Sequence, residues 1–245
     1  MKKLGLLFIA IITLAACTSE ETNLQIKGKV QGLKKGTLYL QKIEDTSLIT
    51  LDSVVMKGDE NFIFDTHIES PQVLYLYLNK KDNNIYDDRL MFFAEPGEMI
   101  INTTLKNFEA DAVVEGSENQ KKFLEYQSMI NRFNTRNLEL IQQSIKAQEE
   151  ENAASLDSAN AEYDKLLRRR YLYTVNFAIN NKDLELAPYL AISEIYDANI
   201  KFLDTIYNSL TPEVKDSRYG KSLEDFLEER REMEKEEAGE TDSQA

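Results

Sequence analysis

The chain has 245 residues, 42% of them hydrophobic, and a formal net charge of −14. This length suits one large domain or two small ones. Such an acidic chain should repel nucleic acid and anionic lipid surfaces, so no nucleic-acid partner is expected.

The N-terminus has the pattern of a secretory signal. Lys2 and Lys3 precede an almost wholly apolar run over residues 4–14, and Ala15 and Ala16 lead to Cys17. The apolar run is too short to cross a bilayer, which takes about 20 residues. The alternative is an ordinary secretion signal that happens to end near a cysteine.

The ending Leu14-Ala15-Ala16-Cys17 resembles the lipobox of bacterial lipoproteins. This resemblance implies cleavage before Cys17 and lipidation of its sulfur, with acyl chains such as palmitate anchoring the protein to the bilayer. Residues 1–16 are therefore expected to be a signal peptide and residues 17–23 the lipidated cysteine and its tether. The acidic residues after Cys17 resemble the surface-export signal of Bacteroidetes lipoproteins. Both faces of the outer membrane, periplasmic and cell surface, stay open as locations.

Residues 24–116 are expected to form a β-domain. The segment 24–30 alternates apolar and polar residues, which is typical of a half-buried strand. Further strands are expected at 37–40, 52–57, 61–65, 73–78, 90–93, 99–104 and 112–114. The turn at 58–60 predicts a hairpin between 52–57 and 61–65. Short strands at this spacing indicate an antiparallel sandwich or barrel.

From Ser117 the apolar spacing becomes helical, so residues 117–237 are expected to form a helical domain. Ser117 and Gln120 fit a capping box. The apolar residues that follow predict one buried helix face: Phe123, Tyr126, Ile130, Phe133, Ile141 and Ile145. A second stripe from Leu156 to Ala178 predicts the returning helix of a long hairpin.

The remaining helices are predicted from their start and stop signals. Pro188 suits the first turn of a helix, and Thr211-Pro212 suits the start of another. Gly220 is expected to break the chain before a last acidic helix, and residues 238–245 are expected to be a disordered acidic tail. The predicted fold is α+β, with an N-terminal β-domain followed by a C-terminal helical domain.

The strand region also carries an ordered set of residues that resembles the DUF4369 domain of Bacteroidetes lipoproteins. The matching residues are Ile26, Gly28, Val30, Gly32, Leu33, Gly36, Tyr39, Leu40, Asp52, Ser53, Gly58, Phe62, Phe64, Pro71, Tyr75, Leu78, Glu95, Pro96, Gly97 and Ile100. In that family a helical segment and then a thioredoxin-like domain with a Cys-x-x-Cys site usually follow. The stretch 210–223 is similar to the end of that helical segment. No Cys-x-x-Cys occurs here, so the resemblance does not carry thiol–disulfide exchange over to this chain.

The sequence offers few candidate sites. Cys17 is the only cysteine, so its lipidation excludes disulfides, a cysteine nucleophile and thiolate metal sites. His67 is the only histidine, and its place beside Phe62 and Phe64 favours a packed or edge residue over a catalyst. The loop with Asp82, Asn83, Asn84, Asp87 and Asp88 could hold calcium, but it lacks EF-hand spacing, which favours a solvated loop. The basic cluster of Lys165, Arg168, Arg169 and Arg170 could dock an acidic partner, although pairing with nearby glutamates is the simpler reading.

These observations favour a non-enzymatic lipoprotein that acts as a binding or scaffold module in the cell envelope. No catalytic, cofactor-binding or metal-binding residue is assigned, and an envelope protein is a candidate partner. One alternative is an accessory subunit of a thioredoxin-like redox system whose redox domain is supplied by a separate chain. A carboxylate-based hydrolase is a third reading that the sequence permits.

Overall fold

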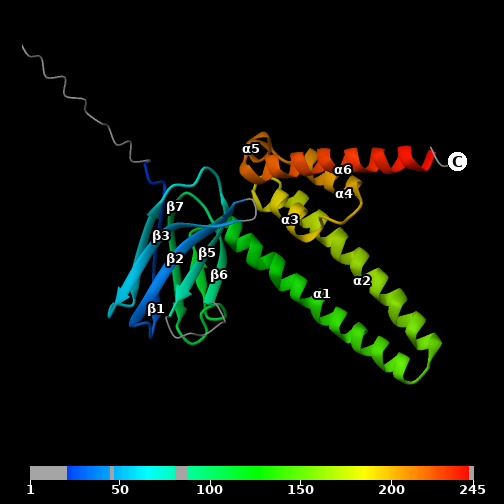
Figure 1. Ribbon diagram of the computed structural model, residues 1–245, viewed down its shortest axis with the longest axis horizontal. Coiled ribbons are helices and arrows are strands. Elements are labelled where there is room, and N and C mark those ends of the chain that lie inside the picture. The colour runs from blue at the N-terminus through cyan, green and yellow to red at the C-terminus, as the bar shows by residue number, and fades with distance from the viewer. Residues whose placement is uncertain (1–20, 45–46, 81–87, 243–245) are drawn as a thin grey trace, which may run out of the picture.

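The computed structural model describes residues 21–44, 47–80 and 88–242 of the chain, and its N-terminal half is a β-sandwich. Its strands are β1 Leu24–Gln31, β2 Lys35–Glu44, β3 Ser47–Lys57, β4 Asn61–Thr66, β5 Gln72–Asn79, β6 Asp88–Ala94, β7 Gly97–Thr104 and β8 Val113–Glu115. One sheet has the order β4-β1-β7-β8 and the other the order β3-β2-β5-β6. Figure 1 shows these sheets face to face, in the manner of a sandwich.

The core lies between the two sheets because alternate residues of each strand point inward. Ile26, Phe64 and Ile101 come from one sheet, and Leu40 and Phe92 from the other, and all are fully buried. Complete burial of a side chain of this size contributes about 1.5–3 kcal/mol.

Two expectations about pairing need correction. The sandwich is not wholly antiparallel, because β1 runs parallel to β7 from Leu24↔Gly97 to Gln31↔Thr104. The expected hairpin between β3 and β4 does not form: β3 pairs with β2, and β4 pairs with β1. The turn carries the chain from one sheet to the other, with Met56 and Phe62 both buried in the core between them. Alternation alone predicts both arrangements equally, so the sequence could not separate them.

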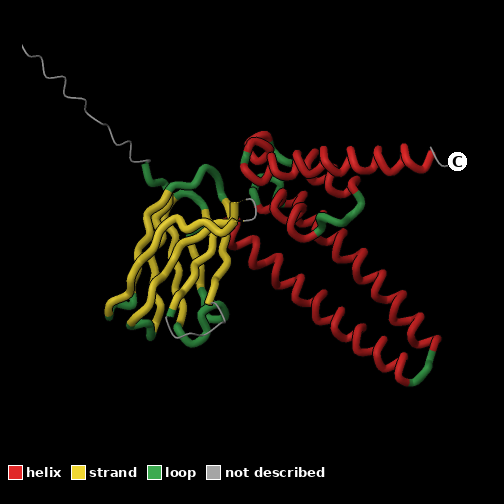
Figure 2. The backbone as a smooth tube through the Cα atoms, in the orientation of Figure 1, coloured by secondary structure: helices red, strands yellow, loops and turns green. Residues whose placement is uncertain are grey.

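The C-terminal half is helical (Figure 2). Its helices are α1 Glu118–Glu149, α2 Ala153–Asn180, α3 Leu186–Glu194, α4 Ile200–Ser209, α5 Pro212–Asp216 and α6 Arg218–Asp242. Helices α1 and α2 form a long antiparallel hairpin that projects away from the rest of the molecule (Figure 1). The fold is therefore α+β, as expected. None of the helices in the described ranges has the length and apolar character needed to span a bilayer.

The buried face of α1 differs from the expected one in its distal half. Tyr126 and Ile130 are buried as predicted, but Ile141 is 44% exposed and Ile145 is 51% exposed. Leu140, which is 2% exposed, takes the buried position there, together with Ala147. The unbroken helical period places Leu140 seven residues after Phe133 and on the same face, whereas Ile141 lies about 100° further round the helix.

Gly220 does not break the chain, because it lies inside α6. A Cβ atom at this position would lie 2.0 Å from the Val214 carbonyl oxygen and 2.5 Å from that of Lys215. The glycine thus permits close packing of α6 on α5. Helix α6 also continues to Asp242, so residues 238–242 belong to the helix rather than to the expected disordered tail.

Candidate functional site at the junction of the two domains

Glu95, the residue after β6, holds the start of α1 against the sandwich. One of its carboxylate oxygens, Oε1, accepts hydrogen bonds from the Ser117 hydroxyl at 2.9 Å, the Asn119 main-chain N–H at 2.6 Å and the Asn119 side-chain amide at 2.8 Å. The Ser117 oxygen in turn accepts from the Gln120 N–H at 2.9 Å. An anionic carboxylate at a helix N-terminus satisfies free N–H groups and interacts favourably with the helix dipole.

Buried Asn119 joins this cap to the third helix. Its side-chain oxygen accepts from the Leu186 main-chain N–H at 2.8 Å, at the start of α3. Its side-chain nitrogen donates to Glu95 and also, at 3.2 Å, to Glu185. A single asparagine therefore fixes the sandwich, α1 and α3 relative to one another.

Side chains of the helical domain also bond the sheet directly. The expected capping box forms only in part, because the Gln120 side chain accepts from the Phe93 N–H of β6 instead of turning back to Ser117. The Tyr219 hydroxyl accepts from the Val73 N–H at 3.0 Å. The Arg218 guanidinium donates to the Gln72 side-chain oxygen. The bonds to Phe93 and Val73 satisfy main-chain N–H groups of the strands through side chains of the helical domain.

The same junction is packed with aromatic rings. Phe93 of β6 meets Tyr189 edge-on with ring centroids 5.6 Å apart, and Tyr219 lies 5.1 Å from Tyr189. Phe123 of α1 joins them at 6.0 Å from Tyr189. Ring contacts and hydrogen bonds thus lie side by side at this joint and together hold the helices on the sandwich.

An open cleft of about 830 Å³ runs along this joint. It is lined by Glu69, Ser70, Pro71, Pro96, Glu185, Glu213, Asp216, Ser217, Arg218 and Lys221. Burial raises the pKa of the Glu185 carboxyl, and the negative charges of Glu95 and Glu213 raise it further. The lining also carries the cations Arg218 and Lys221, so the cleft can make polar contacts of both signs.

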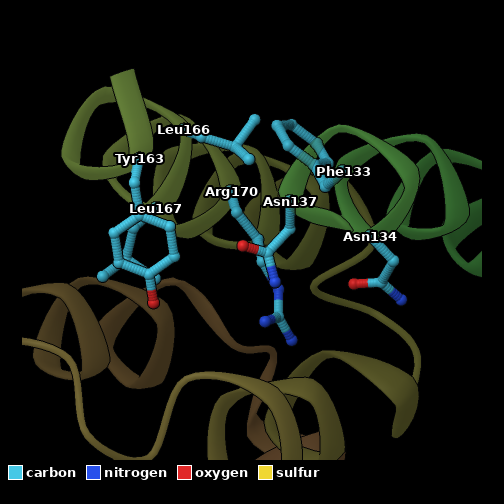
Figure 3. Close-up of a pocket in the computed structure, with 7 residues that line it drawn as sticks. All are labelled: Phe133, Asn134, Asn137, Tyr163, Leu166, Leu167 and Arg170. Carbon is cyan, nitrogen blue, oxygen red and sulfur yellow. The ribbon is translucent and has the colours of Figure 1, made fainter. Parts of the chain in front are cut away.

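A second, much smaller pocket of about 50 Å³ lies between α1 and α2 (Figure 3). The buried Asn137 Oδ1 and Arg170 Nε atoms in its lining find no hydrogen-bond partner in the part of the chain that the structure describes. A water molecule can accept from Arg170 Nε and donate to Asn137 Oδ1. The volume fits one or two waters, at about 30 Å³ each, rather than a ligand.

The site residues suggested by the sequence do not form a common site within the described part of the chain. Cys17 lies outside the described residues, as do Asp82, Asn83, Asn84 and Asp87 of the candidate calcium loop. Asp88, in β6, forms an ion pair with Lys80. Within the described ranges no group of acidic, histidine or cysteine side chains is arranged to hold a metal ion.

His67 follows β4 instead of lying within it, and it is exposed. Its Nδ1 atom lies 3.0 Å from the main-chain oxygen of Glu21, so it contacts the tether. In the basic cluster, Lys165 pairs with Glu162 within α2, as predicted. Arg170 instead pairs with Glu194 of α3 at 2.9 Å, and Arg168 and Arg169 are exposed.

Sequence reasoning did not predict the role of the junction residues. Glu95 belongs to the family pattern, but the sequence predicts no capping role for it and no contact with the sandwich for Asn119, Glu185 or Tyr219. One signal was available for Glu95: an acidic residue at the end of a strand, near a helix start in the same fold, is a common capping partner.

Part of the chain matches a known protein family. The model of the DUF4369 family, a domain of unknown function, matches residues 24–123. No curated protein matches the chain. The matched segment covers every strand of the sandwich and runs past the expected boundary at residue 116 into the first turns of α1, where Ser117, Asn119 and Gln120 bond the sheet. Residues 24–123 of this chain are therefore a DUF4369 domain, and the domain includes the capped start of the helix that follows its sheets.

Proposed function

We propose that this protein is a lipid-anchored, non-enzymatic module of the cell envelope that binds or positions a partner protein. The anchor is Cys17, in a sequence that resembles a lipobox, and the location is the outer membrane, on its periplasmic or its outer face. The hairpin of α1 and α2 is the element that the anchored sandwich holds out toward a partner.

The observation that carries this proposal is how Glu21 and Asn23 are held on the sandwich, a few residues after the cysteine in sequence. The Asn23 main-chain oxygen accepts from the Gly97 N–H at 2.7 Å, and the Asn23 side chain donates to the Ile68 carbonyl at 2.8 Å. The contact between Glu21 and His67 extends this attachment toward the N-terminus. Only Thr18, Ser19 and Glu20 separate Cys17 from residues held on the sandwich, so the Cα atoms of Cys17 and Glu21 lie at most about 14 Å apart.

Such a short tether has a consequence for orientation. It keeps the end of the sandwich that carries Asn23 and Gly97 close to the bilayer. The tip of the hairpin lies far from the start of β1 (Figure 1), so it points away from that end. Because the polar joint fixes the hairpin to the sandwich, the anchored protein presents the hairpin at a set distance and angle. This geometry suits a scaffold better than it suits a freely swinging receptor.

Fatty-acid labelling of the protein in its native cells tests the anchor. The wild-type chain is expected to take up labelled fatty acid and to stay with the envelope fraction, and Cys17→Ser is expected to lose both properties. Ser19→Ala, two residues away, is the control and should behave as wild type. An unlabelled wild-type chain, or a Cys17→Ser variant that stays membrane-bound, would overturn the proposal.

The redox alternative makes a different prediction. An accessory subunit of a thioredoxin-like system should crosslink in cells to a protein with that fold. Recovery of such a partner through the hairpin or the junction cleft would replace the scaffold role with the redox one. A scaffold for other partners predicts that thioredoxin-like proteins are absent from the crosslinked products.

A further inference from the structure

Helix α1 has two faces, of which only one is covered in its distal half. The covered face includes the buried residues Leu140 and Ala147, and α1 packs along α2. A second face lies about 100° round the helix, and we call it the outer stripe. Its members are Asn131, Asn134, Leu138, Ile141, Ile145 and Gln148. All six are exposed, and their spacing of three, four, three, four and three residues is that of a coiled-coil seam.

The composition of the outer stripe is unlike that of a solvated helix face. None of its six members is charged, although the same stretch of α1 carries Arg132, Arg136, Glu139 and Lys146 at other positions. Leu138 is 61% exposed, which is unusual for a leucine in a regular amphipathic helix. A helix with one covered apolar face and a second, uncharged one is typical of a helix that packs against two neighbours.

We propose that the outer stripe is the contact surface for a second copy of this chain, with the two α1 helices parallel. This inference rests on the lipid anchor proposed above. Two copies anchored to one membrane are related by a two-fold axis along the membrane normal, so helices that point away from the bilayer run in the same direction. Each stripe residue then faces its own counterpart.

The residues of the stripe fit this symmetric pairing. In heptad terms Asn131, Leu138 and Ile145 occupy the a positions, and Asn134, Ile141 and Gln148 the d positions. A single asparagine at an a position is a device that fixes register in parallel two-stranded coiled coils. Amide side chains can both donate to and accept from an identical partner, whereas a charged residue would repel its own copy. An uncharged stripe is therefore self-complementary and offers no charge to select a different partner.

The size of the stripe predicts how strong the association is. Residues 131–148 of an α-helix extend over about 27 Å, and a contact strip about 10 Å wide covers roughly 270 Å² per copy. Stable complexes bury about 800 Å² per partner, so the pair should be weak between free molecules. Confinement to one membrane raises the effective concentration of the second copy and favours the pair there.

Cysteine crosslinking in native membranes tests the proposal, because a lipidated Cys17 leaves an introduced cysteine as the only thiol. Facing a positions in a parallel pair lie within reach of a disulfide, about 5–7 Å between Cα atoms. Leu138→Cys is expected to give a disulfide-linked dimer on oxidation. Gln143→Cys, exposed on the opposite side of the same helix, is the matched control and should give none. Ile141→Asp added to Leu138→Cys should abolish the dimer.

The outcomes distinguish this proposal from the anchor. A dimer formed by the wild-type chain would mean that the Cys17 thiol is free, and it would overturn the anchor. With the wild-type chain membrane-bound and unlinked, equal behaviour of the Leu138→Cys and Gln143→Cys variants would overturn the pairing alone. A Leu138→Cys product of a mass other than twice that of the chain would assign the stripe to a different partner and would also overturn it.

Discussion

Replacing Glu95 by alanine should weaken the contact between the sandwich and the helices. Its effect should exceed that of any other single substitution of an exposed or half-buried residue at that edge of the sandwich. The carboxylate accepts from the Ser117 hydroxyl and from two N–H groups of Asn119, one of them on the helix backbone. Its loss removes the negative charge at the start of α1 and leaves the buried amide of Asn119 with Glu185 as its remaining acceptor.

The size of the effect follows from these contacts. Hydrogen bonds to a charged group contribute about 1.5–3 kcal/mol each, but they are not additive and water reaches a half-buried site, so Glu95→Ala should lower the free energy of unfolding by about 3 kcal/mol. Glu95→Gln keeps an acceptor oxygen and loses the charge, so its cost should be about 1 kcal/mol, the size of a charge–helix dipole interaction.

Urea unfolding of the mature chain, followed by circular dichroism, measures both values. The control is Glu98→Ala, three residues along, because Glu98 is exposed and its ion pair with Lys27 should contribute less than about 1 kcal/mol. Amide hydrogen exchange adds a local readout, since the Asn119 N–H should exchange faster in Glu95→Ala. If Glu95→Ala costs no more than Glu98→Ala, the capping role argued for Glu95 is wrong.

Three further predictions concern packing and pH. Gly220→Ala should lower the thermal midpoint, with a cost of about 1–3 kcal/mol, because its Cβ would meet the Val214 carbonyl oxygen at 2.0 Å; an unchanged or raised midpoint would contradict the close approach. Glu185 has a raised pKa, so its ionised form is disfavoured in the folded state and stability should rise as the pH falls through that pKa toward 4.5. Glu185→Gln should abolish this rise and be more stable than wild type near neutral pH. Glu60 should give the opposite pH dependence of stability. A hydrogen bond from Lys34 lowers the pKa of the Glu60 carboxyl from 4.5 to about 2, so stability is lost as the pH falls between these values. Glu60→Gln should lack that loss. Urea midpoints measured across this pH range check both; profiles that match wild type would refute them.

The sequence predicted the elements of the fold well and their pairing less well. Alternation predicts β1, a run of β-favouring residues predicts β5, and helical spacing predicts α1 and α2, because these patterns follow from local geometry. Whether Asn61–Thr66 returns beside β3 or crosses to the other sheet depends on contacts with β1, which alternation does not encode. The parallel pairing of β1 with β7 is likewise a property of the whole sandwich.

The second face of α1 can be recognised in the sequence. Apolar character and approximate helical spacing predict that Ile141 and Ile145 lie on the buried face. The unbroken period from Phe133 instead selects Leu140 and Ala147, which are the buried residues. Apolar residues that do not follow the helical spacing of the buried face thus indicate a second face of α1, and that face is the outer stripe.

The junction residues were beyond sequence reasoning because their partners are distant in the chain. Tyr219 and Val73 are 146 residues apart, and Asn119 and Leu186 are 67 apart. No local pattern links such pairs, since each consists of one ordinary polar side chain and one backbone N–H group. The packing of α6 on β5 brings the first pair together, and the packing of α3 on the start of α1 brings the second pair together.

The segment Glu95-Pro96-Gly97 connects the two ends of the proposed function. The Gly97 N–H bonds the Asn23 carbonyl, next to the tether, and its φ of 123° is a conformation that favours glycine. Two residues earlier, Glu95 caps the helix that forms the first arm of the hairpin. Three consecutive residues therefore connect Asn23 to the start of α1, and in the proposed function they carry the orientation set by the anchor to the hairpin. A joint of this kind has a clear use if the hairpin must meet a second hairpin in parallel, because a two-fold pair forms only when both copies hold the same angle to the membrane.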